Sequence, residues 1–254
     1  MPPIDTLINT LDGLLKPGGY RDYCPNGLQV PGPEHVTRVI TGVSAHAELF
    51  EAAAQRGADL VLVHHGLFWN SGPRALDRVA VRRLRLLFDH DIALAAYHLP
   101  LDGHQEHGNN ALLAAALGAE SWVPFAEYKG SPIGVAATFS GDGISRAELV
   151  DRVRTATAGR EPLAFLDGPD PVRRIGIVSG AAADHIHDAL DAGLDAFLTG
   201  EPSERIMAVA RDYGITFIAA GHHATERFGV RRLGELLAER HGVEHEFVDV
   251  PNPI

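Results

Sequence analysis

The sequence predicts an α/β fold built from two similar lobes, and two observations support this prediction. Short aliphatic runs alternate with amphipathic helical patterns along the 254 residues, as strands and helices do in α/β proteins. The order of these patterns in the first half recurs in the second half, which indicates an internal duplication. We therefore expect two lobes, formed by residues 1–125 and 126–254.

The composition is that of an ordinary globular protein. Hydrophobic residues make up 45% and charged residues 22% of the chain, and the formal net charge of −11 disfavours a nucleic-acid partner. The single cysteine, Cys24, cannot form an intrachain disulfide. No run reaches the ~18 apolar residues of a membrane span, and the N-terminus lacks the basic residues of a secretory signal. We expect a soluble, cytoplasmic protein without a membrane partner.

The first lobe is expected to open with an amphipathic helix, because apolar residues recur at helical spacing from Ile4 to Leu15. The aliphatic run Leu60–Val63, bounded by glycines, is typical of a buried parallel strand. The other expected elements are strands at Val36–Val43 and Ile92–Ala96, and helices at Ala45–Arg56, Ala75–His90 and Gly108–Leu117, with Asn109 as the candidate cap of the last.

Two further expectations concern this lobe. Pro100 favours a loop over His98–Asp102, because its ring is incompatible with a helix interior. In the helix Ala75–His90, we expect an apolar face to be buried and the arginines to be solvated, with a phosphate or partner patch as the alternative. The apolar positions are Val79, Leu84, Leu87 and Phe88, and the arginines are Arg74, Arg78, Arg82, Arg83 and Arg85.

The second lobe repeats the alternation after Trp122–Lys129, which is the expected boundary between the lobes. Ser145 predicts a helix start, because Glu148 follows three residues later as in a capping box. The expected strands are Ile133–Phe139, Leu163–Leu166, Val172–Val178, Ala196–Thr199, Ile215–Ala219 and Glu246–Val250, and the expected helices are Ser145–Ala156, Asp184–Ala192, Pro202–Tyr213 and Ala224–Arg240.

Matching residues in the two halves carry the repeat. In each half a strand and a helix lead to a Gly-x-Asp turn, Gly57 to Asp59 and Gly193 to Asp195, and then to another strand. The next strand ends in AAYHLPLD in the first half and in AAGHHATE in the second. Both endings place a carboxylate four residues after a histidine, in the pairs His98 with Asp102 and His222 with Glu226.

Histidines and carboxylates at these strand ends predict a metal site between the lobes. His64 and His65 follow Leu60–Val63 directly, and open α/β sheets bind ligands beyond the carboxyl ends of their strands. Because neighbouring side chains in a regular strand point to opposite faces, the strand must end or bend here if both rings face one site. Otherwise, one histidine binds or packs and the other is solvated. Mixed imidazole and carboxylate ligands suit two divalent metals that activate a water for hydrolysis.

With these residues in view, the chain resembles the Nif-three-like dinuclear-metal proteins, also described as GTP cyclohydrolase I type 2 homologues. The motifs that carry the resemblance are NGLQV, VHHGLFW, YHLPLDGH, GNN, TGE and AAGHHATERFGV, between residues 26 and 230. The resemblance implies a two-lobed α/β subunit, a toroidal homo-hexamer and two divalent metal ions per subunit. Imidazole and carboxylate ligands suit Zn, Fe, Mn, Ni or Co.

The resemblance also implies roles for individual residues. The implied metal ligands are His64, His65, Asp102, His222 and Glu226. His98 and Glu201 are the candidate catalytic residues, since either could move protons near the metals. His223 is expected beside the ligands rather than among them.

The main functional hypothesis is a metal-dependent hydrolase that acts on a nucleotide or a related small molecule. The chain lacks the phosphate loop G-x-x-x-x-G-K-[ST], so the residues themselves do not indicate binding of a guanine nucleotide. The alternative is a non-enzymatic, metal-binding hexamer that acts as an adaptor or regulator. A third hypothesis, a ring that threads DNA, is disfavoured by the net charge of −11.

Overall fold

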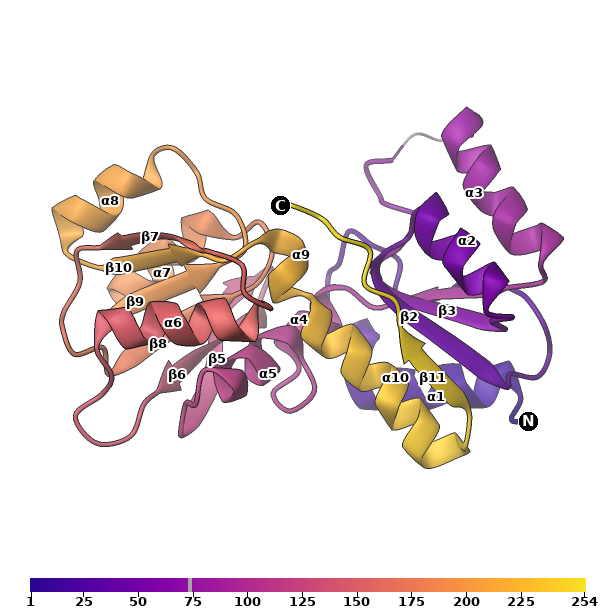
Figure 1. Ribbon diagram of the computed structural model, residues 1–254, viewed down its shortest axis with the longest axis horizontal. Helices are drawn as coiled ribbons and strands as arrows, with labels where there is room; N and C mark the ends of the chain where they lie inside the picture. Colours follow the sequence, from indigo (N-terminus) through magenta and orange to yellow (C-terminus); the bar gives the residue numbers. More distant parts are fainter. Residues whose placement is uncertain (73–74) are drawn as a thin grey trace. The chain divides into compact units, whose positions relative to one another are not determined.

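The computed structural model describes residues 1–72 and 75–254, which form two compact units (Figure 1). The first unit contains Met1–Leu101 and Gly229–Pro251, and the second contains Asp102–Phe228 and Asn252–Ile254. The chain therefore enters the second unit earlier than the expected boundary at residue 125, and it returns to the first unit near its end. Most of the segment expected as the boundary lies in β5 (Ser121–Tyr128), which pairs with β6 (Ser131–Thr138).

The first unit is built on a five-stranded, mostly parallel sheet. Its strands are β1 (Gly27–Val30), β2 (Arg38–Ser44), β3 (Leu60–His65), β4 (Ala93–Ala96) and β11 (Glu244–Phe247). Its helices are α1 (Ile4–Leu15), the 3-10 turn η1 (Pro17–Gly19), α2 (Ala47–Gln55), α3 (Arg78–Asp89), the start of α4 (Leu99–Gly103) and most of α10 (Arg227–His241). The order is β1-β4-β3-β2-β11, with only the edge strand β1 antiparallel to its neighbour.

Strand β3 is buried on both faces of this sheet. Leu60 and Leu62 pack in the core that contains α1 and α10, whereas Val61 and Val63 pack with α2 and α3. Figure 1 shows α2 and α3 on one side of the strands and α1 and α10 on the other. A strand between two helix layers must be apolar on both faces, which is why the run Leu60–Val63 identified it.

Helix α3 is shorter and more exposed than predicted. It begins at Arg78, because Oδ1 of Asp77 accepts a hydrogen bond from the N–H of Ala80 at 2.7 Å and caps the helix. Of its expected core residues only Leu87 is buried, while Val79 and Phe88 are 55% and 61% exposed. Arg74 lies outside the described residues.

The segment after β4 was predicted as a loop but forms the short helix α4. Pro100 is its second residue, and a proline in the first turn of a helix loses no hydrogen bond because that N–H has no intrahelical partner. The predicted cap Asn109 is likewise the first residue of the following helix, and Gly108 is the cap. Both segments begin close to chain turns, where local patterns leave the boundary uncertain by a few residues.

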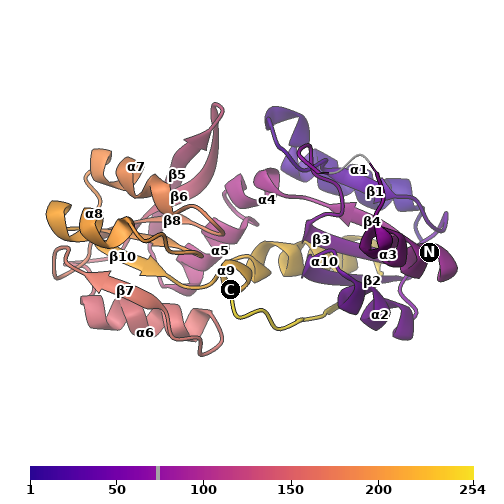
Figure 2. The same cartoon turned by 90° about the horizontal axis from the view of Figure 1, so that it is seen from above.

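The second unit is built on a six-stranded mixed sheet. Besides β5 and β6 its strands are β7 (Leu163–Leu166), β8 (Arg174–Val178), β9 (Ala196–Thr199) and β10 (Thr216–Ala219). Its helices are α5 (Asn109–Ala116), α6 (Arg146–Ala156), the 3-10 turn η2 (Ala183–His185), α7 (Ile186–Asp191), α8 (Ile206–Tyr213) and α9 (His222–Thr225). The order is β5-β6-β8-β9-β10-β7, and the central strands β8, β9 and β10 are parallel. Figure 2 shows α6 on one face of this sheet and α7 and α8 on the other.

Sequence signals account for the ends of some of these elements but not for others. Ser145 caps α6 as predicted, since its hydroxyl accepts the N–H of Glu148 at 3.1 Å. Strand β9 has the predicted bounds. The single helix predicted at Ala224–Arg240 is instead two helices, α9 and α10, with Glu226 between them.

In each unit, an aspartate holds the equivalent Gly-x-Asp turn with the same two hydrogen bonds. Oδ2 of Asp59 accepts hydrogen bonds from two consecutive backbone N–H groups at the start of β2, at 2.6 and 2.9 Å. Oδ2 of Asp195 does the same at the start of β8, at 2.8 and 3.0 Å. Gly57 and Gly193 precede these aspartates with φ angles of +64° and +63°. In each unit, three parallel strands lie side by side in chain order around this turn.

Candidate metal centre

Three histidines come together in the first unit at the carboxyl ends of β3 and β4. His64 and His65 are the last residues of β3, and His98 follows β4. The ring centroid of His64 lies 4.7 Å from that of His65 and 4.9 Å from that of His98. One ligand nitrogen from each of the three side chains lies within 4.8 Å of the other two. Both His64 and His65 lie within β3, whose pairing with β2 continues to His65.

The same nitrogen of each ring is held by the protein. Nδ1 of His64 lies 2.9 Å from the carbonyl oxygen of Tyr97, and Nδ1 of His65 lies 3.0 Å from the hydroxyl of Ser44. Nδ1 of His98 lies 2.9 Å from a carboxylate oxygen of Asp22. With Nδ1 engaged, Nε2 is the nitrogen that each ring can present to a metal, and such partners are typical of metal-bound histidines.

Asp22 is a buried carboxylate that the sequence analysis did not single out. It accepts hydrogen bonds from the backbone N–H groups of Cys24 and Leu99 at 3.0 and 2.9 Å, and from the amide of Asn26 at 3.0 Å. Burial on its own raises the pKa of Asp22, but His98 and these donors outweigh it and lower the pKa to about 2. The carboxylate is therefore ionised at neutral pH and orients His98.

Polar side chains from β1 and the loop before it hold the segments that carry the histidines. The carbonyl oxygen of the Asn26 side chain accepts the N–H of His98 at 2.8 Å, and that of Gln29 accepts the N–H of Leu67 at 2.9 Å. Asn26 and Gln29 stood in the motif NGLQV, which gave only a weak signal by itself. The aromatic rings of Tyr23 and Trp69 lie 4.9 and 5.3 Å from the ring of His98.

This donor set fits a divalent transition metal. One nitrogen from each of the three imidazoles lies within 4.8 Å of the other two, so the side chains are near enough to share one ion. Imidazole is a ligand of Zn, Fe and Ni rather than of Mg or Ca. The residues present in the first unit therefore match a metal of the predicted kind.

In the second unit, His222 lies between two carboxylates. Its Nδ1 is 2.5 Å from Oε1 of Glu201, and its Nε2 is 3.1 Å from Oε2 of Glu226. Burial would lower the pKa of His222, but hydrogen bonds and charge from Glu226 and then Glu201 raise the pKa to about 9. At neutral pH this imidazole holds a proton between the carboxylates, and a metal would have to displace that proton to bind.

A glycine makes room for the pair formed by His222 and Glu226. A Cβ atom at Gly180 would lie 2.4 Å from Oε1 of Glu226 and 3.2 Å from Nε2 of His222. Gly180 also has a φ of +70°, which disfavours other residues. Its N–H donates to the hydroxyl of Thr225 at 3.2 Å. The backbone after β8 thus passes directly beside the two candidate ligands.

Asp102, the remaining predicted ligand, is buried and held by neutral donors. The side-chain amide of Asn109 and the hydroxyl of Ser179 both donate to its Oδ1, at 2.8 and 3.1 Å. Asn110 donates to the backbone oxygen of Asp102 at 3.2 Å and accepts the N–H of Ser179 at 2.7 Å. Asn109 and Asn110 form the GNN motif, whose role in orienting Asp102 the sequence did not reveal.

The predicted site residues therefore fall into two sets. The first set, His64, His65 and His98, belongs to the first unit, and the second set, Asp102, Glu201, His222 and Glu226, belongs to the second. His223 is partly exposed, and its N–H donates to the oxygen of Ile254 at 3.0 Å. The residues that sequence reasoning missed are those that orient the ligands, Asp22, Ser44, Asn109 and Ser179.

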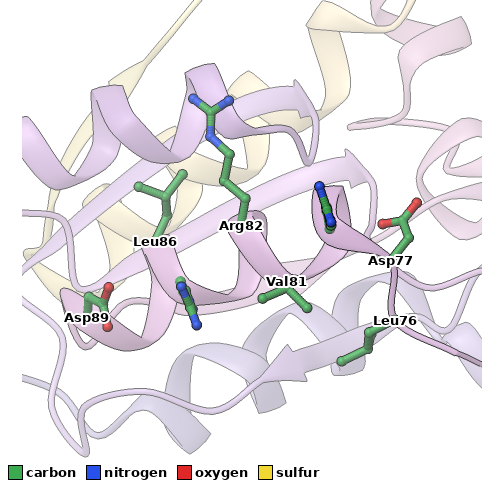
Figure 3. Close-up of a pocket in the computed structure, with 8 residues that line it drawn as sticks. Leu76, Asp77, Val81, Arg82, Leu86 and Asp89 are labelled. Atoms are coloured by element: carbon green, nitrogen blue, oxygen red, sulfur yellow. The ribbon is translucent and has the colours of Figure 1, made fainter.

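The arginines of α3 line a groove of about 470 Å³ along the outer side of that helix (Figure 3). Arg78, Arg82 and Arg85 share it with Asp77 and Asp89 at its ends. The carboxylate of Glu51 pairs with Arg82 at 2.7 Å, so one of these cations is already compensated.

In the described part of the chain, no helix has the length and apolarity that crossing a membrane requires.

Comparison with known proteins places these features in a family. The model of the Duf34/NIF3 (NGG1p interacting factor 3) family matches residues 2–253. A relative from Pseudomonas aeruginosa, named GTP cyclohydrolase 1 type 2 homolog, is 46% identical over 251 residues, which are 98% of each chain. A relative from Escherichia coli with the same name is 42% identical over 246 residues, 94% of each chain.

Two solved structures share the fold over their full length. Protein ybgI, described as of unknown function, has a TM-score of 0.93 at 39% identity, with 100% of both chains covered. A protein from Thermus thermophilus has a TM-score of 0.89 at 34% identity, again with 100% of both chains covered. Since the family match extends from residue 2 to residue 253, the protein belongs to the DUF34/NIF3 family.

Proposed function

We propose that the protein is a dinuclear, metal-dependent hydrolase that acts on a nucleotide or a related small molecule. The observation that carries this proposal is the common orientation of four histidines. His64, His65, His98 and His222 each have Nδ1 engaged by a protein oxygen, as metal-binding histidines do.

In this proposal, the metal ligands are those implied by the family resemblance. They are His64, His65, Asp102, His222 and Glu226. Two divalent ions would supply a nucleophile by lowering the pKa of a bound water. Carboxylates from Asp102 and Glu226 offset the charge of the ions, which neutral imidazoles cannot do.

His98 and Glu201 are the proposed proton carriers. A carboxylate oxygen of Asp22 lies 2.9 Å from Nδ1 of His98 and orients this imidazole for proton transfer. The side chain of Glu201 is 36% exposed, so it can exchange protons with solvent while it holds Nδ1 of His222. A nucleotide is proposed as the substrate because relatives carry the name GTP cyclohydrolase 1 type 2 homolog. The homo-hexamer and the cytoplasmic location belong to the same proposal.

The first experiment is elemental analysis of protein purified without chelator or affinity tag. We expect about two metals per subunit in the wild type and a sharp decrease in Glu226→Gln. Glu235→Gln is the matched control, because Glu235 lies on α10 and pairs with Arg232 at 3.2 Å rather than with a candidate ligand. A hydrolysis screen of the loaded protein against nucleotides follows. Absence of metal after reconstitution would contradict the metal centre, and full metal content without any turnover would contradict the hydrolase.

The alternative, a metal-binding adaptor or regulator, is favoured by the burial of several donors. His64 is inaccessible to solvent, and Asp102 and Glu226 are only 7% and 3% exposed. Catalytic metals keep a coordination position open, whereas structural sites are closed. Binding of a small exogenous ligand such as azide to a cobalt-substituted protein would change its visible spectrum only if a position is open.

A further inference from the structure

An arginine of the second unit packs against the residue that precedes His222. Arg160 lies in the connection between α6 and β7, and its side chain covers the backbone of Gly221. A Cβ atom at position 221 would lie 2.6 Å from Nε of Arg160 and 2.9 Å from its Cδ and Cζ. Only a glycine lets the guanidinium come this close, and Gly221 also has a φ of +100°.

The backbone before Arg160 is held in an uncommon conformation. Ala158 and Gly159 have φ angles of +59° and +85°, and the N–H of Gly159 donates to the oxygen of Arg154 at 2.8 Å. A residue other than glycine in the left-handed region costs free energy, and such positions are frequent at functional sites. This turn after α6 brings Arg160, rather than another residue of the loop, to Gly221.

Arg160 differs from Arg154 in whether its charge is compensated by a carboxylate. Arg154 pairs with Glu161 at 2.5 Å and also with Asp151, whereas within the described residues the guanidinium of Arg160 has no hydrogen bond or ion pair. Nε of Arg160 is buried, and the side chain as a whole is partly exposed. A cation that the fold does not compensate is a ready-made partner for an anion.

We propose that Arg160 binds a terminal oxyanion of the substrate, a phosphate or a carboxylate, beside His222. Nε faces the backbone of Gly221, so the two Nη groups are the ones that can donate hydrogen bonds to two oxygens of such an anion. This inference rests on the proposed function, because it assigns an anionic substrate to the same candidate site. It makes Arg160 an anchor for the non-reacting end of that substrate.

The test is calorimetric titration of the metal-loaded protein with inorganic phosphate and, separately, with acetate. We expect Arg160→Gln to weaken binding of one of these anions at least tenfold, and Arg160→Lys to weaken it less, because lysine keeps the charge but not the paired donors. A tenfold loss for phosphate alone identifies a phosphate substrate, and one for acetate alone identifies a carboxylate. Arg154→Gln, in the last turn of α6 and already ion-paired, is the control and should leave both affinities unchanged.

The outcomes separate this inference from the proposed function. Missing metal in the wild type would contradict the metal centre. Full metal content with anion binding that is equal in the wild type and Arg160→Gln would overturn the role of Arg160. If Arg160→Gln does not fold, phenylglyoxal modification of the wild type replaces it. Phosphate or acetate should then slow the labelling of Arg160, measured by peptide mass spectrometry, and unchanged labelling would overturn the inference.

Discussion

The carboxyl ends of the parallel strands in the two units differ in chemistry although the strands are arranged alike. In the first unit, β3 and β4 lead to three imidazoles, and a single buried carboxylate, Asp22, stands behind one of them. In the second unit, β9 and β10 lead to one imidazole between Glu201 and Glu226. The turn fixed by Asp59 or Asp195 is the same in both. The first unit therefore presents mainly nitrogen donors and the second mainly oxygen donors, and the difference lies in the few residues beyond each strand.

This difference has a consequence for metal binding. Neutral imidazoles hold a transition metal by covalent character, whereas carboxylates hold it mainly by charge. His222 must lose a proton that two carboxylates retain, because its pKa is raised to about 9. Binding to the second set should therefore release a proton and depend more strongly on pH than binding to the first.

The largest expected effect is the loss of metal when one donor is removed from either set. His65→Ala and Glu226→Gln should each reduce the metal content per subunit, because each leaves an incomplete coordination sphere. Elemental analysis of each variant and of the double variant measures this. Unfolding should stay cooperative by circular dichroism. Unchanged metal content in either single variant would remove that residue from the proposed ligands.

The next expected effect concerns Cys24, whose reactivity reports how well the loop that carries Asp22 is shielded from solvent. Burial, together with the charge of Asp22, raises the pKa of the Cys24 thiol to about 11. Compared with an ordinary thiol of pKa near 9, about 100-fold less thiolate is present at pH 8. Iodoacetamide should label Cys24 slowly in the folded protein and rapidly in urea.

The raised pKa of Cys24 also predicts how the free energy of unfolding changes with pH. The unfolded thiol loses its proton first as the pH rises from 9 towards 11, so the free energy of unfolding should decrease over this range. Serine at position 24 should remove that part of the decrease. If iodoacetamide labelled Cys24 in the folded protein as fast as a free cysteine, the loop that contains Asp22 and Cys24 would be open to solvent.

A smaller effect is expected from the residues that hold Nδ1. Asp22→Asn should weaken metal binding about 10- to 100-fold, because an ionised carboxylate behind a histidine orients it and increases its basicity. Glu201→Gln should have a smaller effect, since this side chain is 36% exposed and its charge is screened. Ser44→Ala should be the mildest. Competition with a chromophoric chelator measures the three affinities, and equal values would mean that burial of the partner does not matter.

Sequence patterns predicted most of the strands but missed β1 and β5, and they predicted the supporting residues poorly, for a physical reason. Leu60–Val63 was recognisable because a strand between two helix layers must be apolar on both faces. Asp22 gave no such signal, since it lies 76 residues from His98 in the chain and only the fold brings the two together. Its own neighbours, a proline- and glycine-rich loop, look like any surface connection.

Helix α3 shows the opposite error. Its apolar residues recur at helical spacing, yet Val79 and Phe88 are 55% and 61% exposed. Periodicity identifies a helix but does not state how much of its apolar face the rest of the chain covers. The candidate ligands were chosen from the motifs HH, HLPLD and GHHATE and stay a prediction, whereas the split at Glu226 into two helices had no signal in the sequence.

The smallest expected effect tests the feature that the two units share. Asp59→Ala and Asp195→Ala each remove a carboxylate oxygen that accepts two backbone N–H groups, and each should lower the free energy of unfolding by about 1 to 3 kcal/mol. Urea denaturation of the metal-free protein measures both losses under one condition. Similar losses would support the view that the turn is an inherited part of a duplicated unit, because the same bonds would then contribute the same stability in two different surroundings. Metal affinity should change little in either variant, since both aspartates lie at the amino ends of the strands, away from the ligands. A loss confined to one variant would mean that the two turns look alike but are stabilised differently, and the comparison of the units would then hold only for their backbone.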